Sequence, residues 1–207
     1  DQVVVNIENQ KIAYFGAKSD ASTKSSRVGA RINAQTLREY IKSYDKVFVM
    51  GHDKSDLDSF GSMVAVYNMA KADIKRVYKV YDFEKLDDTM QKIVSSLDEK
   101  DKVFENVYNT ERAINELDND TLLIVVDTQT PKIVMSPELL EKAKNIVIID
   151  HHRISEEGFN AIYSYVEPSA SSTIELLVEL MGFYEDYKFN FSLSEANLMY
   201  GGLVLDT

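Results

Sequence analysis

Two short segments of the chain consist almost entirely of aliphatic residues, and they restrict the fold more than any other feature. They are residues 121–126, Thr-Leu-Leu-Ile-Val-Val, and residues 145–149, Asn-Ile-Val-Ile-Ile. A strand that is apolar at every position, and not only at every second one, is buried on both faces, as in a parallel sheet. The sequence therefore predicts an α/β protein whose parallel sheet carries helices on both faces.

The rest of the chain alternates between strand and helix patterns from about residue 33 onward. Further strands are expected at 46–50, 75–80 and 163–166, and helices at 59–71, around 90–97, after Ser136-Pro137, at 171–181 and from 194 to 206. Leu37, Tyr40, Ile41 and Tyr44 recur at helical spacing. Asn33 is expected to cap the start of that helix.

The first 32 residues follow a different pattern. Residues 2–7 and 11–15 predict a short β hairpin, and the polar segment 17–26 predicts a linker. We therefore expect the tail of a preceding domain with its linker at 1–32, and an α/β domain at 33–207.

Composition and charge exclude several classes of protein. The chain of 207 residues has a net charge of −11, which makes long nucleic acid an unfavourable partner. It has no cysteine, which excludes disulfides and thiolate metal ligands and agrees with a cytoplasmic domain. No apolar run is long enough to cross a membrane, so we expect no membrane contact from this segment.

Three of the predicted strands are followed at once by carboxylates and imidazoles, which include all three histidines of the chain: His52, Asp56, Asp58, Asp127, Asp150, His151 and His152. The carboxyl ends of parallel strands meet at one edge of a sheet, where ligands bind. Asp56 and Asp58 stand so close in sequence that joint ionisation is opposed unless a cation lies between them. Oxygen and imidazole donors without sulfur suit manganese, magnesium, iron or zinc. The pattern predicts a divalent metal site.

The motifs resemble the signature of the DHH phosphoesterase superfamily. Four fragments appear in the family's order over residues 33 to 207: His52-x-x-x-Asp56-x-Asp58 with Ser59 and Gly61, Val126-Asp127-Thr128, Asp150-His151-His152, and Leu205-Asp206-Thr207. Within the superfamily, the chain is most similar to the membrane-anchored cyclic-di-AMP phosphodiesterases of the GdpP type. In that group a degenerate GGDEF domain precedes the DHH domain, and its last strands are similar to residues 1–5 and 11–16.

The resemblance implies two divalent ions, most often manganese, with magnesium, iron, cobalt and zinc as alternatives. One ion would be held by His52, Asp56 and Asp127, and the other by Asp58, Asp127, His151 and Asp206. It further implies that Asp150 orients an imidazole and that His152 contacts the scissile phosphate or the leaving oxygen. Arg153 could add positive charge near that phosphate, and Ser171, Ser172 and Thr173, at an expected helix start, could bind an anion through their N–H groups.

The activity implied is hydrolysis of cyclic-di-AMP to the linear dinucleotide by a water that two metal ions activate. The family's C-terminal substrate-binding domain is absent from the chain, so this fragment is expected to bind metal yet to cleave poorly. The parent protein is expected to be anchored in the cell membrane, and a homodimer is an open alternative to a monomer.

Two other functions in the same superfamily stay open. An oligoribonuclease or single-strand exonuclease would favour a basic groove, and an inorganic pyrophosphatase would carry the His52 motif very near the chain start. A hypothesis of another class is a catalytically idle regulatory or interaction module in which the ions serve folding.

Overall fold

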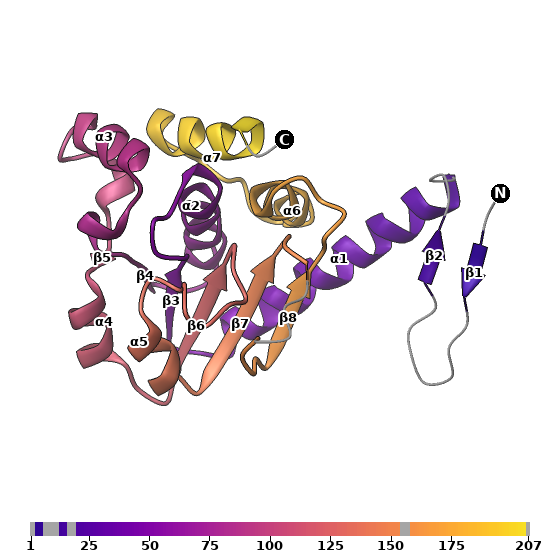
Figure 1. The fold of residues 1–207 in the computed structure, drawn as a ribbon, viewed down its shortest axis with the longest axis horizontal. Coiled ribbons are helices and arrows are strands. Elements are labelled where there is room, and N and C mark those ends of the chain that lie inside the picture. Colours follow the sequence, from indigo (N-terminus) through magenta and orange to yellow (C-terminus); the bar gives the residue numbers. More distant parts are fainter. Residues whose placement is uncertain (1–2, 6–12, 16–19, 154–157, 206–207) are drawn as a thin grey trace.

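The computed structural model describes residues 3–5, 13–15, 20–153 and 158–205 (Figure 1). A parallel sheet of six strands forms its centre, in the order β5-β4-β3-β6-β7-β8. The strands are β3 (Lys46–Met50), β4 (Arg76–Val80), β5 (Val107–Tyr108), β6 (Thr121–Val126), β7 (Asn145–Asp150) and β8 (Tyr163–Val166). The predicted fold class is confirmed.

Seven α-helices and two short 3₁₀ helices accompany this sheet in the described residues. The α-helices are α1 (Asp20–Lys42), α2 (Leu57–Lys71), α3 (Asp88–Ser96), α4 (Thr110–Glu116), α5 (Pro137–Lys142), α6 (Thr173–Met181) and α7 (Leu193–Leu205), and the 3₁₀ helices are η1 (Phe83–Lys85) and η2 (Lys102–Phe104). Helix α2 contacts α1, α6 and α7, whereas α4 and α5 contact each other and lie away from that group (Figure 1).

The order of the strands reverses between β3 and β6. The chain first runs outward from β3 to β4 and β5, then returns to place β6 on the other side of β3 and continues outward to β7 and β8. In doubly wound sheets, ligands bind in the crevice at the carboxyl ends of the strands where the order reverses. The register pairs Met50 with Val125 and Val126 with Ile149, so the residues after β3, β6 and β7 emerge at the same edge.

Helix α2 is buried almost all round, because the sheet lies on one side of it and α6 and α7 lie on the other. Its sequence, Leu-Asp-Ser-Phe-Gly-Ser-Met-Val-Ala-Val-Tyr-Asn-Met-Ala-Lys, accordingly lacks a polar face over most of its length. The first residues of this central helix are the ones that follow His52 and Asp56 in the chain. A predicted ligand, Asp58, thereby stands at the start of the most buried helix of the fold.

Helix α1 begins earlier than the sequence predicts. Residues 20–26, expected in a linker, are helical, and Asn33 lies inside the helix. Ala34 and Ala30 are buried about one and two turns before Leu37, so the buried stripe continues toward the N-terminus. The side chain of Asn33 accepts a hydrogen bond from the Tyr163 hydroxyl at 2.7 Å and does not cap the helix. The predicted helix start at Asn33 is therefore wrong, because the small side chains of Ala30 and Ala34 do not mark a buried face until their burial is known.

Two short strands precede α1. Strands β1 (Val3–Val5) and β2 (Ala13–Phe15) pair antiparallel, with Val4 opposite Tyr14, as a hairpin requires. The predicted turn at 8–10, the adjoining ends of the two predicted strands, and residues 17–19 of the expected linker lie outside the described residues. Among the helices that the structure describes, none has the length and apolar character needed to traverse a bilayer.

Candidate metal centre

Asp127 stands at the middle of the carboxyl edge, directly after β6. Its φ of 62° is left-handed, a conformation that costs a non-glycine residue roughly 1 kcal/mol and that aspartate tolerates better than most. Its Oδ2 lies 3.4 Å from Nε2 of His52, and its Oδ1 lies 3.6 Å from Nε2 of His151. A single buried carboxylate thus lies between imidazoles that follow two different strands.

His52 is held so that Nε2 faces Asp127. Its Nδ1 lies 2.7 Å from the carbonyl oxygen of Asp53 and must carry the proton, because a carbonyl only accepts. Asp56 Oδ1 lies 3.9 Å from the same Nε2. His52, Asp56 and Asp127 each offer a ligand atom within 4.8 Å of the others. Burial lowers the pKa of His52, but the bonds to Asp127 and Asp53 outweigh burial and raise that pKa to about 9.

Gly51 allows the chain to turn from β3 into this loop. A Cβ at Gly51 would lie 2.1 Å from Oγ of Ser59, which accepts the N–H of His52 at 3.3 Å. The N–H of Ser59 in turn donates to Oδ1 of Asp56 at 3.0 Å, which makes Asp56 the N-cap of α2. The start of α2 therefore fixes both His52 and Asp56.

A second group forms on the other side of Asp127, where Asp127, His151 and His152 offer ligand atoms within 4.8 Å of one another. His151 Nε2 also lies 3.7 Å from Oδ2 of Asp58, which is 2% exposed. Burial and then the charge of Asp127 raise the pKa of Asp58 to about 8. Two buried carboxylates held this close repel each other unless a cation lies between them, and carboxylate and imidazole donors suit a divalent ion. The donor set fits the metal ions expected from the sequence.

Asp150 orients His152. Oδ1 of Asp150 accepts the Nδ1 proton of His152 at 2.7 Å and its backbone N–H at 3.2 Å, and Oδ2 accepts the amide of Gln129 at 2.9 Å. Burial opposes ionisation of Asp150, but the bonds from His152 and Gln129 lower its pKa overall. The His152 side chain is 57% exposed, so part of its ring is open to solvent.

Four more residues were predicted at the site: Arg153, Ser171, Ser172 and Asp206. Arg153 is exposed, and its carbonyl accepts a hydrogen bond from Gln129 at 3.2 Å. Ser171 donates its N–H and its hydroxyl to Glu175, and the hydroxyl of Ser172 accepts the Glu175 N–H at 3.2 Å. These groups cap helix α6, so the predicted contact of Ser171 and Ser172 with substrate stays a prediction. Asp206 lies outside the described residues.

Two residues at the centre carry roles that sequence reasoning did not assign. Gln129 binds Asp150 and the carbonyls of His152 and Arg153. Thr173 donates its hydroxyl to Oδ1 of Asp127 at 2.9 Å. The only signal in the sequence is that Gln129 follows Asp127 by two residues, and no spacing marks Thr173 as a partner of a carboxylate 46 positions earlier.

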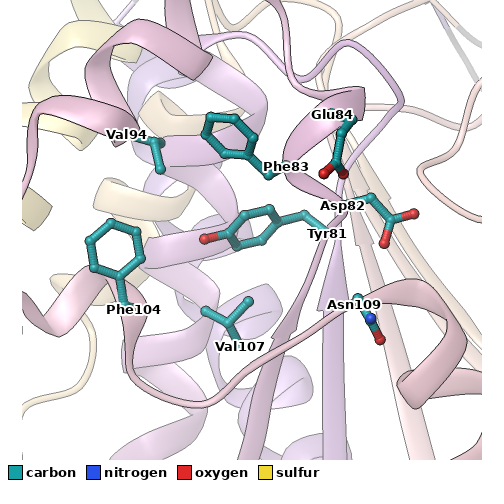
Figure 2. A pocket seen from close by; sticks show the side chains of 8 residues that line it. All are labelled: Tyr81, Asp82, Phe83, Glu84, Val94, Phe104, Val107 and Asn109. Carbon is teal, nitrogen blue, oxygen red and sulfur yellow. The ribbon is translucent and has the colours of Figure 1, made fainter. Parts of the chain in front are cut away.

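The same edge of the sheet carries a hollow of about 430 Å³, at the ends of β4 and β5 (Figure 2). Tyr81, Phe83 and Phe104 project into it, and Asp82, Glu84, Val94, Val107 and Asn109 complete its lining. None of the metal-ligand candidates lines it. The segment that follows β4 contacts the loop that carries them, because the N–H of Asp87 donates to the carbonyl of Ser55 at 3.2 Å. The metal-ligand candidates therefore lie outside this hollow, at the same edge of the sheet.

Residues 46–203 match the sequence model of the DHH family, N-terminal domain, and the chain belongs to this family. The membrane protein–large ribosomal subunit bL9 fusion protein of Onion yellows phytoplasma is 46% identical over 210 residues, which cover 100% of this chain and 25% of that protein. The cyclic-di-AMP phosphodiesterase PdeA of Listeria monocytogenes is 36% identical over 208 residues, which cover 100% of this chain and 32% of that protein. The chain thus spans between a quarter and a third of the length of these relatives.

A solved structure, that of an exopolyphosphatase-related protein from Bacteroides fragilis, has the same fold. Its TM-score is 0.58 at 22% identity, and the likeness covers 86% of this chain and 50% of that chain.

Proposed function

We propose that the chain is the metal-binding part of a phosphodiesterase that hydrolyses cyclic-di-AMP to the linear dinucleotide pApA. The observation that carries the proposal is the Asp127 carboxylate, whose two oxygens face His52 on one side and His151 on the other. The family membership and the identity to a cyclic-di-AMP phosphodiesterase over the whole chain support the choice of substrate.

The residues that would hold one divalent ion are His52, Asp56 and Asp127, and those that would hold a second are Asp58, Asp127, His151 and Asp206. Manganese is the proposed ion, and magnesium, iron, cobalt and zinc are the alternatives. When bound, such ions supply positive charge to a phosphoryl group and lower the pKa of a water molecule. The bonds to Asp53 and Ser59 hold His52 and Asp56 near Asp127.

His152 is the proposed proton donor to the leaving oxygen. Its bond from Nδ1 to Asp150 stabilises the charged imidazole, and the proton would be donated from Nε2. Arg153, which follows in the chain and is exposed, would add charge beside the phosphate, and Ser171 and Ser172 would contact the substrate from the start of α6.

We also propose how this chain is placed in its parent protein and in the cell. Residues 1–32 would be the tail of a preceding domain with its connection, and residues 33–207 the DHH domain, with α1 running across the boundary. The parent protein would be anchored in the cell membrane with this domain in the cytoplasm, in keeping with the membrane-protein name of the phytoplasma relative. The partner would be a small dinucleotide and not a long nucleic acid, and a second copy of the chain is an alternative to a monomer.

Titration with Mn²⁺ while cleavage of cyclic-di-AMP is followed, in this chain and in the longer protein that contains it, tests the proposal. We expect Mn²⁺-dependent cleavage in the longer protein, weak cleavage by the chain alone, and loss of both cleavage and ion binding in Asp127→Ala. Cleavage by Asp127→Ala at the parent rate would overturn the bridging role. Faster cleavage of short RNA than of cyclic-di-AMP would favour the oligoribonuclease, and ion binding without any cleavage would favour the idle module.

A further inference from the structure

Helix α6 is capped by a carboxylate from another helix. The N–H of Thr173 donates to Oδ2 of Asp58 and the N–H of Ile174 donates to Oδ1, each at 2.8 Å. The first N–H groups of a helix have no partner within the helix, and a neighbouring carboxylate satisfies them. Both oxygens of Asp58 are thereby fixed in direction by two adjacent residues of α6.

Thr173 reaches a second carboxylate with its side chain. Its hydroxyl donates to Oδ1 of Asp127 at 2.9 Å, and this is the oxygen that lies 3.6 Å from His151. Thr173, Asp58 and Asp127 are all buried, so water does not compete for these bonds. One residue thus binds two acids, one at the start of α2 and the other at the end of β6.

We propose that Thr173 is a positioning residue of the metal centre: its hydroxyl sets the direction of the Asp127 carboxylate, and its N–H sets that of Asp58. Two like-charged carboxylates in a buried site would otherwise turn apart, because repulsion between them is weakly screened there. Thr173 is the first residue of α6, a helix of nine residues, so its N–H bond to Asp58 and its hydroxyl bond to Asp127 both come from the start of this helix. The inference rests on the proposed function, in which Asp58 and Asp127 are metal ligands.

Replacing Thr173 by valine isolates the hydroxyl. Thr173→Val keeps the shape of the side chain and the N–H bond to Asp58, and it removes only the bond to Asp127. We expect its affinity for Mn²⁺ alone, measured by isothermal titration calorimetry, to fall by about 10- to 100-fold, as is typical when a partner of a metal ligand is lost. Thr173→Ser retains a hydroxyl and is expected to bind Mn²⁺ within about threefold of the parent, a rescue that fold stability alone would not produce.

Thr110 offers a matched control. It is the first residue of α4, and its N–H and hydroxyl donate at 2.9 and 2.7 Å to Asp82, a carboxylate that is not one of the metal-ligand candidates. Thr110→Val removes the same kind of bond and is expected to lower the unfolding temperature without changing Mn²⁺ affinity. Where Thr173→Val does not fold, Thr173→Ala removes the hydroxyl without placing a methyl group beside the carboxylate.

The outcomes separate the two proposals. If the hydroxyl-deleted variant binds Mn²⁺ as the parent does while Asp127→Ala does not bind it, the positioning role is overturned and the proposed function stands. If Asp127→Ala also binds Mn²⁺ as the parent does, the proposed function itself is overturned. Weak binding in the hydroxyl-deleted variant, restored in Thr173→Ser and unaffected in Thr110→Val, is the result that supports the inference.

Discussion

Gly202 of α7 lies against the backbone of Asp58 at the start of α2. A Cβ at Gly202 would stand 2.9 Å from the Cα of Asp58 and 2.6 Å from the carbonyl oxygen of Leu57, closer than side chains approach backbone. Gly61 of α2 makes the same kind of close contact with α7, because a Cβ at Gly61 would lie 3.0 Å from the carbonyl oxygen of Leu198. The last described helix therefore packs directly on the segment that carries a proposed metal ligand.

Replacing Gly202 by alanine is expected to push α7 away from α2 and to shift Asp58. We expect the free energy of unfolding to fall by about 1–3 kcal/mol, as for an overpacked core, and Mn²⁺ binding to weaken. Chemical denaturation and Mn²⁺ titration measure both effects. Gly29→Ala in α1 is the control, because nothing lies within 4 Å of a Cβ there, and alanine is expected to stabilise that helix by about 0.5–1 kcal/mol. A Gly202→Ala protein as stable as the parent would show that the two helices separate without cost.

Asp150→Asn separates orientation of His152 from metal binding. The amide keeps the size of the carboxylate but loses the charge that holds the Nδ1 proton of His152 at 2.7 Å. In the longer protein we expect turnover of cyclic-di-AMP to fall by about 10- to 100-fold while the number of bound Mn²⁺ ions stays the same. Loss of an ion from Asp150→Asn would instead make Asp150 a ligand.

Lys79 makes stability depend on pH in an unusual direction. It is fully buried in β4, and burial lowers its pKa to about 8 although Glu195, Glu105 and Asp101 act to raise it. Because the pKa of the folded state lies below the value of 10.5 in the unfolded chain, the unfolded state binds more protons between pH 8 and 10.5. The contribution of Lys79 to stability therefore rises with pH over this range. Below pH 8 the buried side chain is charged, and its burial destabilises the folded state by the full amount.

Lys79→Met is accordingly expected to be more stable than the parent at pH 7, by about 1–2 kcal/mol, since methionine has a similar length and places no charge in the core. The loss of the contact between Lys79 Nζ and the Tyr67 ring, at 4.1 Å, reduces the gain. Urea denaturation of both proteins at several pH values should show the advantage shrinking from pH 8 upward. An advantage of Lys79→Met that grows with pH would contradict a lowered pKa of Lys79 in the folded state.

Arg38 ties α1 to the rest of the domain. Its guanidinium donates to Asp73 at 2.7 and 2.9 Å and to Asp186 at 2.5 and 3.0 Å, and it lies over the ring of Tyr184 at 4.7 Å. Arg38→Ala leaves Asp73 with the more exposed Lys42, whose Nζ lies 3.3 Å away, and is expected to cost about 1.5–3 kcal/mol of unfolding free energy. Arg31→Ala is the control, since Arg31 meets the exposed Glu185 only at 4.0 Å and is expected to cost less than about 0.5 kcal/mol. Equal losses in the two variants, measured by denaturation, would contradict this.

The sheet was predictable because a strand that is buried on both faces appears in the sequence as an unbroken run of aliphatic residues. β6 begins and ends where the run of aliphatic residues does, and α5 starts after Ser136, whose hydroxyl accepts the N–H of Leu139 at 3.2 Å as the sequence of a cap followed by proline predicts. The start of α1 was not predictable in this way, because the burial of Ala30 and Ala34 depends on what packs against them.

By itself, the sequence determined the kind of protein and the chemical types at its edge: a parallel sheet whose strands end in carboxylates and imidazoles, in the order of the DHH family. Only the tertiary structure decided which atoms meet. Asp58 and Thr173 are 115 positions apart, and Gln129 and Asp150 are 21 apart. A hydrogen bond between such segments leaves no periodic trace, because its partners are brought together by the packing of helices and strands and not by the chain between them.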